Sequence, residues 1–160
     1  MSEAVNNALN NVDMVYDELI QIANETVESI IGDINSIICD IQSDLENMNN
    51  DLIRDYILKL CLKSYSFSDI KEKAAFKAEI AETIRKEAYA KQFNSTEGTV
   101  AVRQNNAEIA ISAEYLSEEI YQLISALLKT KADEIHRVVD ALKTVLMSRL
   151  QEAKISITGV

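Results

Sequence analysis

Residues 27–45 of the chain read VESIIGDINSIICDIQSDL. Apolar residues recur in this stretch at steps of three and four, which places them on one side of an α-helix. The pattern extends in both directions, through Val5, Leu9, Val12, Tyr16, Leu19, Ala23, Val27, Ile30, Ile34, Ile37, Ile41, Leu45 and Met48. Its mean step is close to the 3.6 residues of a straight helix, rather than the 3.5 of a leucine zipper. We therefore predict one long, gently curved helix over about residues 3–48.

The composition extends a helical prediction to the whole chain. Its 160 residues include no proline and three glycines, too few for the tight turns of β-sandwiches, barrels and α/β folds. Apolar residues make up 48% and charged residues 26%, a balance typical of a chain with a buried core rather than a disordered tail. The sequence thus predicts an all-α fold, with a single domain over residues 1–160.

Polar interruptions divide the rest of the chain into further helices. Residues 47–51, NMNND, form the first break, since Asn and Asp favour caps and turns. We predict short helices over 51–63 and 69–92, separated by the serine-rich residues 64–68 and the capping-box spacing that begins at Ser66.

A loop over 93–98 precedes the last predicted helix, residues 99–154. We expect Gly98 to adopt a backbone conformation that other residues resist, and Thr99 to cap the helix. The apolar side of this helix is predicted to be Ile109, Ala113, Leu116, Ile120, Leu123, Leu127, Ile135, Val138, Leu142, Leu146, Leu150 and Ala153. Two long helices joined by shorter ones predict an elongated, antiparallel, hairpin-like bundle that forms homo-oligomers.

The charge of the chain is unevenly distributed. The net charge is −10, and residues 1–55 contain twelve acidic residues against one basic residue, Arg54. This excludes a strongly basic nucleic-acid-binding domain but leaves room for a local basic face in the remainder. No apolar stretch approaches the roughly 20 residues that cross a bilayer, and residues 1–4 do not resemble a secretory signal. We therefore expect a cytoplasmic protein without a membrane partner.

Residues that commonly perform catalysis or bind metals are scarce. His136 is the single histidine, no nucleophile-elbow motif accompanies it, and we expect it at the surface. Cys39 and Cys61 lie among apolar neighbours, which favours buried free thiols over a disulfide or a zinc site. The sequence predicts no enzyme, no cofactor and no metal.

Basic and aromatic residues gather between Lys71 and Arg103. On a helix, Lys73, Lys77 and Lys91 lie within about 40° of one another, an arrangement that can follow a phosphate backbone. The same sector holds Ile80 and Ile84, so these lysines can equally extend from a packed face. The neighbouring aromatic residues suit base stacking but are more often core residues; they are Phe76, Tyr89 and Phe93.

Several short motifs in this half of the chain occur together: Lys86-Glu87-Ala88-Tyr89, Glu97-Gly98-Thr99-Val100 with Arg103, Tyr115, Ala141-Leu142-Lys143 and Ser148-Arg149-Leu150. Over residues 69–154 they resemble the UvsY-like recombination mediators of bacteriophages. The resemblance implies a ring-forming, non-enzymatic accessory protein of phage recombination and replication in the host cytoplasm. Such a protein binds single-stranded DNA and helps to load a recombinase. Its implied phosphate contacts are Lys77, Lys86, Lys91 and Arg103, and its last helix would assemble the oligomer.

The acidic helix over 3–48 departs from that family pattern and opposes DNA affinity, because binding depends on neutralising phosphates. It suggests an arm for a protein partner, or a guard over the basic surface. The alternative function is a helical scaffold, virion component, adaptor or acidic DNA-mimic inhibitor that binds no nucleic acid.

Overall fold

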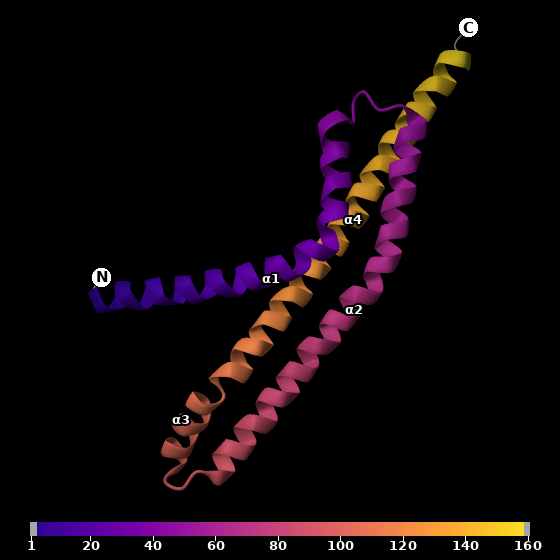
Figure 1. The fold of residues 1–160 in the computed structure, drawn as a ribbon. Coiled ribbons are helices and arrows are strands. Elements are labelled where there is room, and N and C mark those ends of the chain that lie inside the picture. The colour runs from indigo at the N-terminus through magenta and orange to yellow at the C-terminus, as the bar shows by residue number, and fades with distance from the viewer. Residues whose placement is uncertain (1–2, 159–160) are drawn as a thin grey trace. The chain divides into compact units, whose positions relative to one another are not determined.

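The structure, a computed structural model, describes the backbone of residues 3–158 and the side chains of residues 14, 17–28 and 31–155. Within this range the chain is helical throughout, apart from short connections (Figure 1). Its helices are α1 (Glu3–Asp44), α2 (Asn50–Ser95), α3 (Val100–Ala110) and α4 (Ser112–Thr158). The all-α prediction is confirmed.

The helices contribute to two compact units. Unit 1 contains the described residues of Met1–Glu28 together with Lys71–Leu128. Unit 2 contains the described residues of Ser29–Ile70 and Lys129–Val160. Because α1, α2 and α4 each run through both units, a single domain over 1–160 stays a prediction.

Unit 2 brings three helical segments together: residues 29–44 of α1, 50–70 of α2 and 129–158 of α4. The turn after α1 reverses the chain, so α2 runs antiparallel to α1 and also to α4 (Figure 1). Large aliphatic side chains from all three segments are fully buried, namely Ile34, Ile53, Leu60, Ile135 and Leu142. Burial of these side chains, at about 1.5–3 kcal/mol each, is the main source of stability in unit 2.

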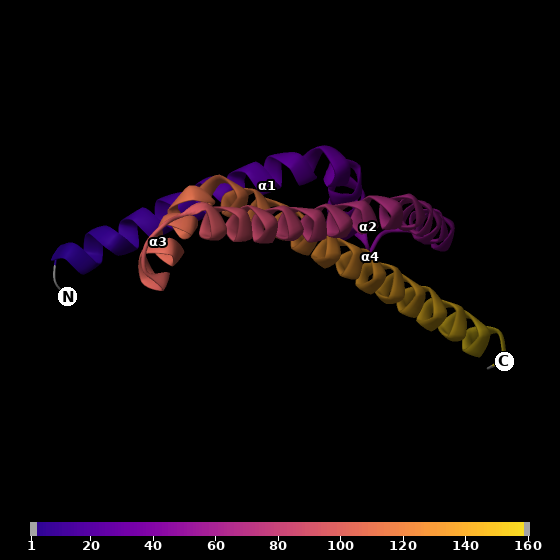
Figure 2. The ribbon, with the colours of Figure 1, turned by 90° about the horizontal axis from the view of Figure 1, so that it is seen from below.

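Unit 1 is organised around an antiparallel pair, residues 71–95 of α2 and 112–128 of α4, which α3 connects (Figures 1 and 2). α1 contributes the buried side chains Ala23 and Val27 to this unit. The antiparallel helices are therefore α2 and α4, whereas the sequence suggested a hairpin of the first and last helices.

The buried positions repeat every seven residues, the spacing of a coiled coil. In α2 they are Ile53, Leu60, Phe67, Ala74 and Ala81, and in α4 they are Leu128, Ala132, Ile135, Val139 and Leu142. In α1 the buried residues Ile31, Ile34, Ile38 and Ile41 alternate steps of three and four. The predicted row passed through Ile37, which is half-buried, whereas its neighbour Ile38 is buried. The side chain of Ile30, also in that row, lies outside the described residues. Adjacent isoleucines at 37–38 leave the choice of side open in the sequence, and the neighbouring helices decide it.

The apolar side predicted for the last helix is likewise displaced. Ile109 and Leu116 are exposed, whereas Ile111 and Glu118 are buried. The displacement begins near Ile111, where φ is −100° and ψ is 15°, so that α3 ends and α4 begins within one residue. The last predicted helix is therefore two helices, although no glycine or proline marks the break.

The break predicted at residues 64–68 does not occur, and α2 is continuous where two short helices were expected. The Ser66 hydroxyl lies 3.3 Å from the Leu62 carbonyl oxygen and 3.0 Å from that of Lys63, so it bonds back to its own helix. Phe67 is buried. Burial of this ring favours a continuous helix over the local caps that serine offers elsewhere.

The remaining connections follow the sequence closely. α1 ends four residues before the predicted limit, and the Asn49 side-chain oxygen accepts a hydrogen bond from the Leu52 N–H at 2.8 Å, capping α2. Gly98 has a φ of +123°, and the Thr99 hydroxyl caps α3 by accepting from the Val102 N–H. Both expectations at this loop are confirmed.

Candidate interaction surface

In unit 1, α2 contributes small side chains to its interface with α4. Ala74 and Ala81 are the buried positions of α2 there, whereas α4 contributes the larger buried side chains Ile124 and Leu128. Beside the alanines, Phe76, Ile80 and Ile84 remain 63%, 43% and 52% exposed. Large apolar side chains of α2 therefore lie at the surface, next to its buried alanines.

A buried ion pair crosses the same interface. The Arg85 Nε–H donates to Oε2 of Glu118, whose side chain is 8% exposed. Oε1 of Glu118 accepts a second hydrogen bond, at 2.9 Å, from the Gln122 amide. Both carboxylate oxygens are thus satisfied, which a buried charge requires. A polar pair at an interhelical position also fixes the register of the two helices.

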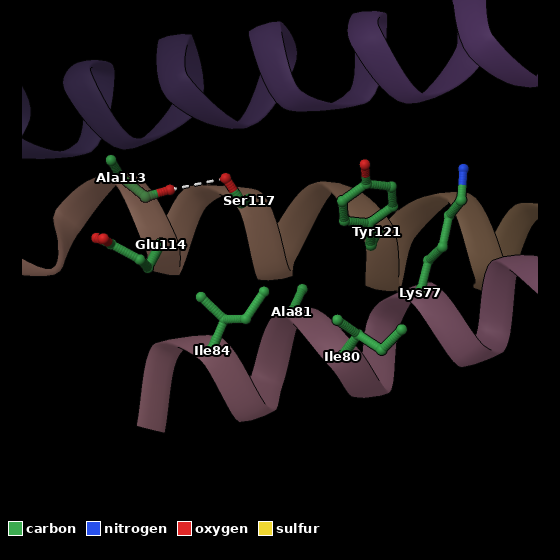
Figure 3. A pocket seen from close by; sticks show the side chains of 8 residues that line it. All are labelled: Lys77, Ile80, Ala81, Ile84, Ala113, Glu114, Ser117 and Tyr121. Atoms are coloured by element: carbon green, nitrogen blue, oxygen red, sulfur yellow. Dashed lines mark hydrogen bonds between the residues drawn. The ribbon is translucent and has the colours of Figure 1, made fainter. Parts of the chain in front are cut away.

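An apolar groove of about 430 Å³ opens along one side of this helix pair, and we call it the α2–α4 groove (Figure 3). The described residues that line it are Lys77, Ile80, Ala81, Ile84, Ala113, Glu114, Ser117 and Tyr121. Ile80, Ala81 and Ile84 form its apolar floor, while Glu114 lies toward one end and Lys77 toward the other (Figure 3). The Lys77 Nζ lies 5.9 Å from the centre of the Tyr121 ring. The groove is thus apolar along its length and oppositely charged at its ends.

A second groove of about 560 Å³ lies at the break between α3 and α4. Its lining combines charged, aromatic and apolar residues: Arg85, Tyr89, Glu108, Ile111, Ser112, Tyr115 and Leu116. The negative charge of Glu119, and then a hydrogen bond with it, raises the pKa of the Tyr115 hydroxyl. Tyr115 is therefore a neutral hydroxyl at physiological pH.

The four predicted phosphate contacts all belong to unit 1, but they do not share one surface. Lys77 borders the α2–α4 groove, and Lys91 is exposed two heptads further along the same side of α2. Lys86, nine residues after Lys77, points to the opposite side of the helix and pairs with Glu82. Its hydrogen bond, and then its positive charge, lowers the pKa of the Glu82 carboxyl group.

Arg103 binds next to the loop that connects α2 to α3. Its Nε–H donates to the Phe93 carbonyl oxygen at 2.8 Å, and its guanidinium carbon lies 4.2 Å from the centre of the Phe93 ring. Tyr89 stacks on Phe93 with ring centres 6.0 Å apart. Tyr89 and Phe93 are half-buried, whereas Phe76 is exposed, so the core interpretation is wrong for Phe76.

Unit 2 carries the side chains that were considered for catalysis or disulfide formation. Cys39 and Cys61 are free, as expected, but both are exposed. Cys39 directly follows the buried Ile38, and Cys61 directly follows the buried Leu60, so each cysteine points away from the core. His136 is exposed, as predicted, beside Cys61 in a small groove of about 290 Å³. Among the residues whose side chains are described, no three metal-ligating groups come together. In the same range, none of the helices has the length and apolar character to span a bilayer.

Sequence reasoning placed Ile80 and Ile84 beside the lysines but missed both the groove and the buried Glu118. The seven-residue period was the available signal. Counting back from Ala132 by heptads places Glu118 and Ile111 at the interface, although a glutamate there looks like a surface residue.

Three comparisons with known proteins found no match. No protein-family model matches the chain, and no curated protein or solved structure matches it significantly.

Proposed function

We propose that the protein is a non-enzymatic, helical interaction module, and that unit 1 binds an amphipathic helix along the α2–α4 groove. The observation that carries the proposal is the exposure of Phe76, Ile80 and Ile84 beside an apolar groove. Contiguous exposed apolar side chains of this size commonly mark interaction sites. A helix with apolar residues at spacings of three and four fits such a groove.

Adaptor and scaffold roles both follow from this binding mode. The proposal includes a cytoplasmic location, in keeping with the exposed free thiols of Cys39 and Cys61.

The first test uses designed amphipathic peptides, one with an acidic and one with a basic polar face, each with a scrambled control. Fluorescence anisotropy measures their binding to the full chain. We expect an amphipathic peptide to bind and its scrambled control not to bind. The affinity should fall about tenfold or more with Ile80→Asp and Ile84→Asp, because a charge in the groove must be desolvated.

Unit 2 offers a matched control on the same helix. Leu58 and Leu62 of α2 are 59% and 64% exposed, so Leu58→Asp and Leu62→Asp add the same charge outside the groove. Binding that these control substitutions weaken equally, or that scrambled peptides reproduce, would contradict a groove-specific site.

Binding of single-stranded DNA and of a recombinase is a second candidate, which rests on the resemblance to UvsY-like mediators. Lys77 and Lys91, exposed on one side of α2, are the observation that favours it. Anisotropy of a labelled oligonucleotide at several salt concentrations tests DNA binding. Saturable binding that weakens with salt and with Lys77→Glu or Lys91→Glu supports it, and flat anisotropy at low salt removes it.

A further inference from the structure

We propose that the occupant of the α2–α4 groove is the N-terminal part of α1, residues 3–28, from a second copy of this chain. The inference rests on the proposed function, because it names the helix that the same groove receives. It assigns a role to the acidic segment of α1, which departs from the pattern of the UvsY-like mediators.

The first support is charge complementarity. Residues 3–28 contain six acidic residues and no basic one. The groove ends at Lys77, whose ammonium group is exposed, and Lys91 is exposed on the same side of α2. Opposite charges on two apolar helical faces favour their association over that of like-charged helices.

The second support is that the described side chains of this part of α1, residues 14 and 17–28, are mostly exposed. Among its residues whose side chains are described, Ala23 and Val27 are the fully buried ones, and Met14 and Ile22 are exposed. The sequence nevertheless provides an apolar row at Leu9, Val12, Tyr16 and Leu19. A helix with such a row is most stable when another helix covers it.

The charges also fix the direction of docking. Glu114 occupies the end of the groove opposite Lys77, and residues 4–12 of α1 carry no charge. These neutral residues fit beside Glu114, and Asp13 and Asp17 then reach Lys77. From residue 9 to residue 17 a helix rises about 12 Å, close to the roughly 10 Å between residues 114 and 121 of α4. The docked helix thus runs parallel to α4.

Unit 2 already shows this arrangement within one chain. There α1 runs antiparallel to α2 and parallel to α4, and its isoleucines complete the core between them (Figure 1). A docked α1 would lie along α2 and α4 of unit 1 with the same polarity.

The test is a complementation experiment on the full chain, followed by sedimentation velocity over a range of concentrations. One variant has a charged groove, Ile80→Asp with Ile84→Asp, and the other has a charged α1, Leu9→Asp with Val12→Asp. We expect the wild type to associate, each variant alone to dissociate at least about tenfold more readily, and their mixture to associate again. The mixture recovers because it combines an intact α1 with an intact groove.

Two controls keep the outcome interpretable. Circular dichroism verifies that each variant is helical. Leu58→Asp with Leu62→Asp adds the same charge to α2 outside the groove, where it should not affect the association. If the charged variants do not fold, a labelled peptide of residues 3–28 replaces them. It should bind the wild-type chain with an affinity that salt weakens.

The results separate this inference from the proposed function. A wild-type chain that stays monomeric, or a mixture of variants that does not associate, overturns the inference. If the designed peptides still bind the groove in that case, the interaction function stands and its occupant is another protein. If the designed peptides do not bind, the proposed function fails as well.

Discussion

Unit 1 and unit 2 use the same antiparallel helices, α2 and α4, but they bury different side chains between them. In unit 2 the heptad positions of α2 carry Ile53, Leu60 and Phe67, whereas in unit 1 they carry Ala74 and Ala81. Large side chains hold helices apart and create room that a third helix fills. Alanines bring two helices close together and leave the larger neighbours at the surface. The residue size at every seventh position therefore separates a core-forming unit from one with an open groove.

Polar contacts differ between the units in the same way. In unit 2, Lys63 of α2 binds Asp33 of α1 at 2.5 Å, and Arg149 of α4 binds the turn that follows α1. These contacts attach α1 to the other helices. In unit 1 the corresponding charged contact, Arg85 with Glu118, links α2 to α4 alone. Among the described side chains, the polar contacts of unit 2 thus join three helices, and this ion pair of unit 1 joins two.

The largest expected effect concerns the buried charge of unit 1. Glu118→Leu leaves Arg85 without its partner in a largely covered position, and we expect a loss of about 3–5 kcal/mol in the free energy of unfolding. Arg85→Leu combined with Glu118→Leu should restore most of that loss, because neither charge is then buried. Urea denaturation followed by circular dichroism measures both. A double variant as unstable as the single one would show that the pair is not the cause.

The core of unit 2 should respond almost as strongly. Leu60 is fully buried, and Leu60→Ala removes a large side chain from between three helices, with an expected cost of about 2–5 kcal/mol. Ala81→Gly in unit 1 removes a single methyl group and adds backbone freedom, for about 1 kcal/mol. Thermal denaturation of both variants tests the contrast, and equal losses would mean that the two interfaces are equivalent.

Arg149 offers a smaller effect, confined to unit 2. Its guanidinium group donates to the carbonyl oxygens of Met48, of Leu45 at 3.1 Å and of Glu46 at 3.3 Å, which lack helical partners after α1 ends. Arg149→Met keeps the length of the side chain and removes these bonds, at an expected cost of about 1–3 kcal/mol. Amide hydrogen exchange should quicken in residues 40–48 and stay unchanged in 77–91. Faster exchange in both regions would contradict a local role.

The smallest effect is a pH dependence. A hydrogen bond from Lys63, and then the positive charge of Lys63, holds the pKa of Asp33 below its ordinary value of 3.8. A carboxyl group with a lowered pKa stabilises the fold above its ordinary value, and this contribution disappears as the pH falls through the lowered pKa. Asp33→Asn should therefore destabilise the chain slightly at pH 7, and progressively less as the pH falls below 3.8. A loss that does not change with pH would exclude the ion pair as the cause.

Local chemistry made several features predictable from the sequence. The absence of proline, the scarcity of glycine and the apolar spacing determined an all-α fold. The caps at Asn49 and Thr99 and the conformation of Gly98 follow from the properties of single residues and their nearest neighbours. Lys77, Ile80 and Ile84 of the predicted sector of α2 likewise proved to line the groove, because helical periodicity alone defines which residues share a side.

Other features depended on contacts between distant residues. Ser64–Ser68 remains helical because Phe67 is buried against other helices, and Ile111 interrupts a segment whose sequence contains no breaker. Glu118 is buried because Arg85, thirty-three residues away, neutralises it. The sequence by itself determined that the chain forms amphipathic helices, since that depends on neighbours three and four residues apart. Only the tertiary structure decided which side of each helix is covered, because that depends on the size and charge of the helix that lies against it.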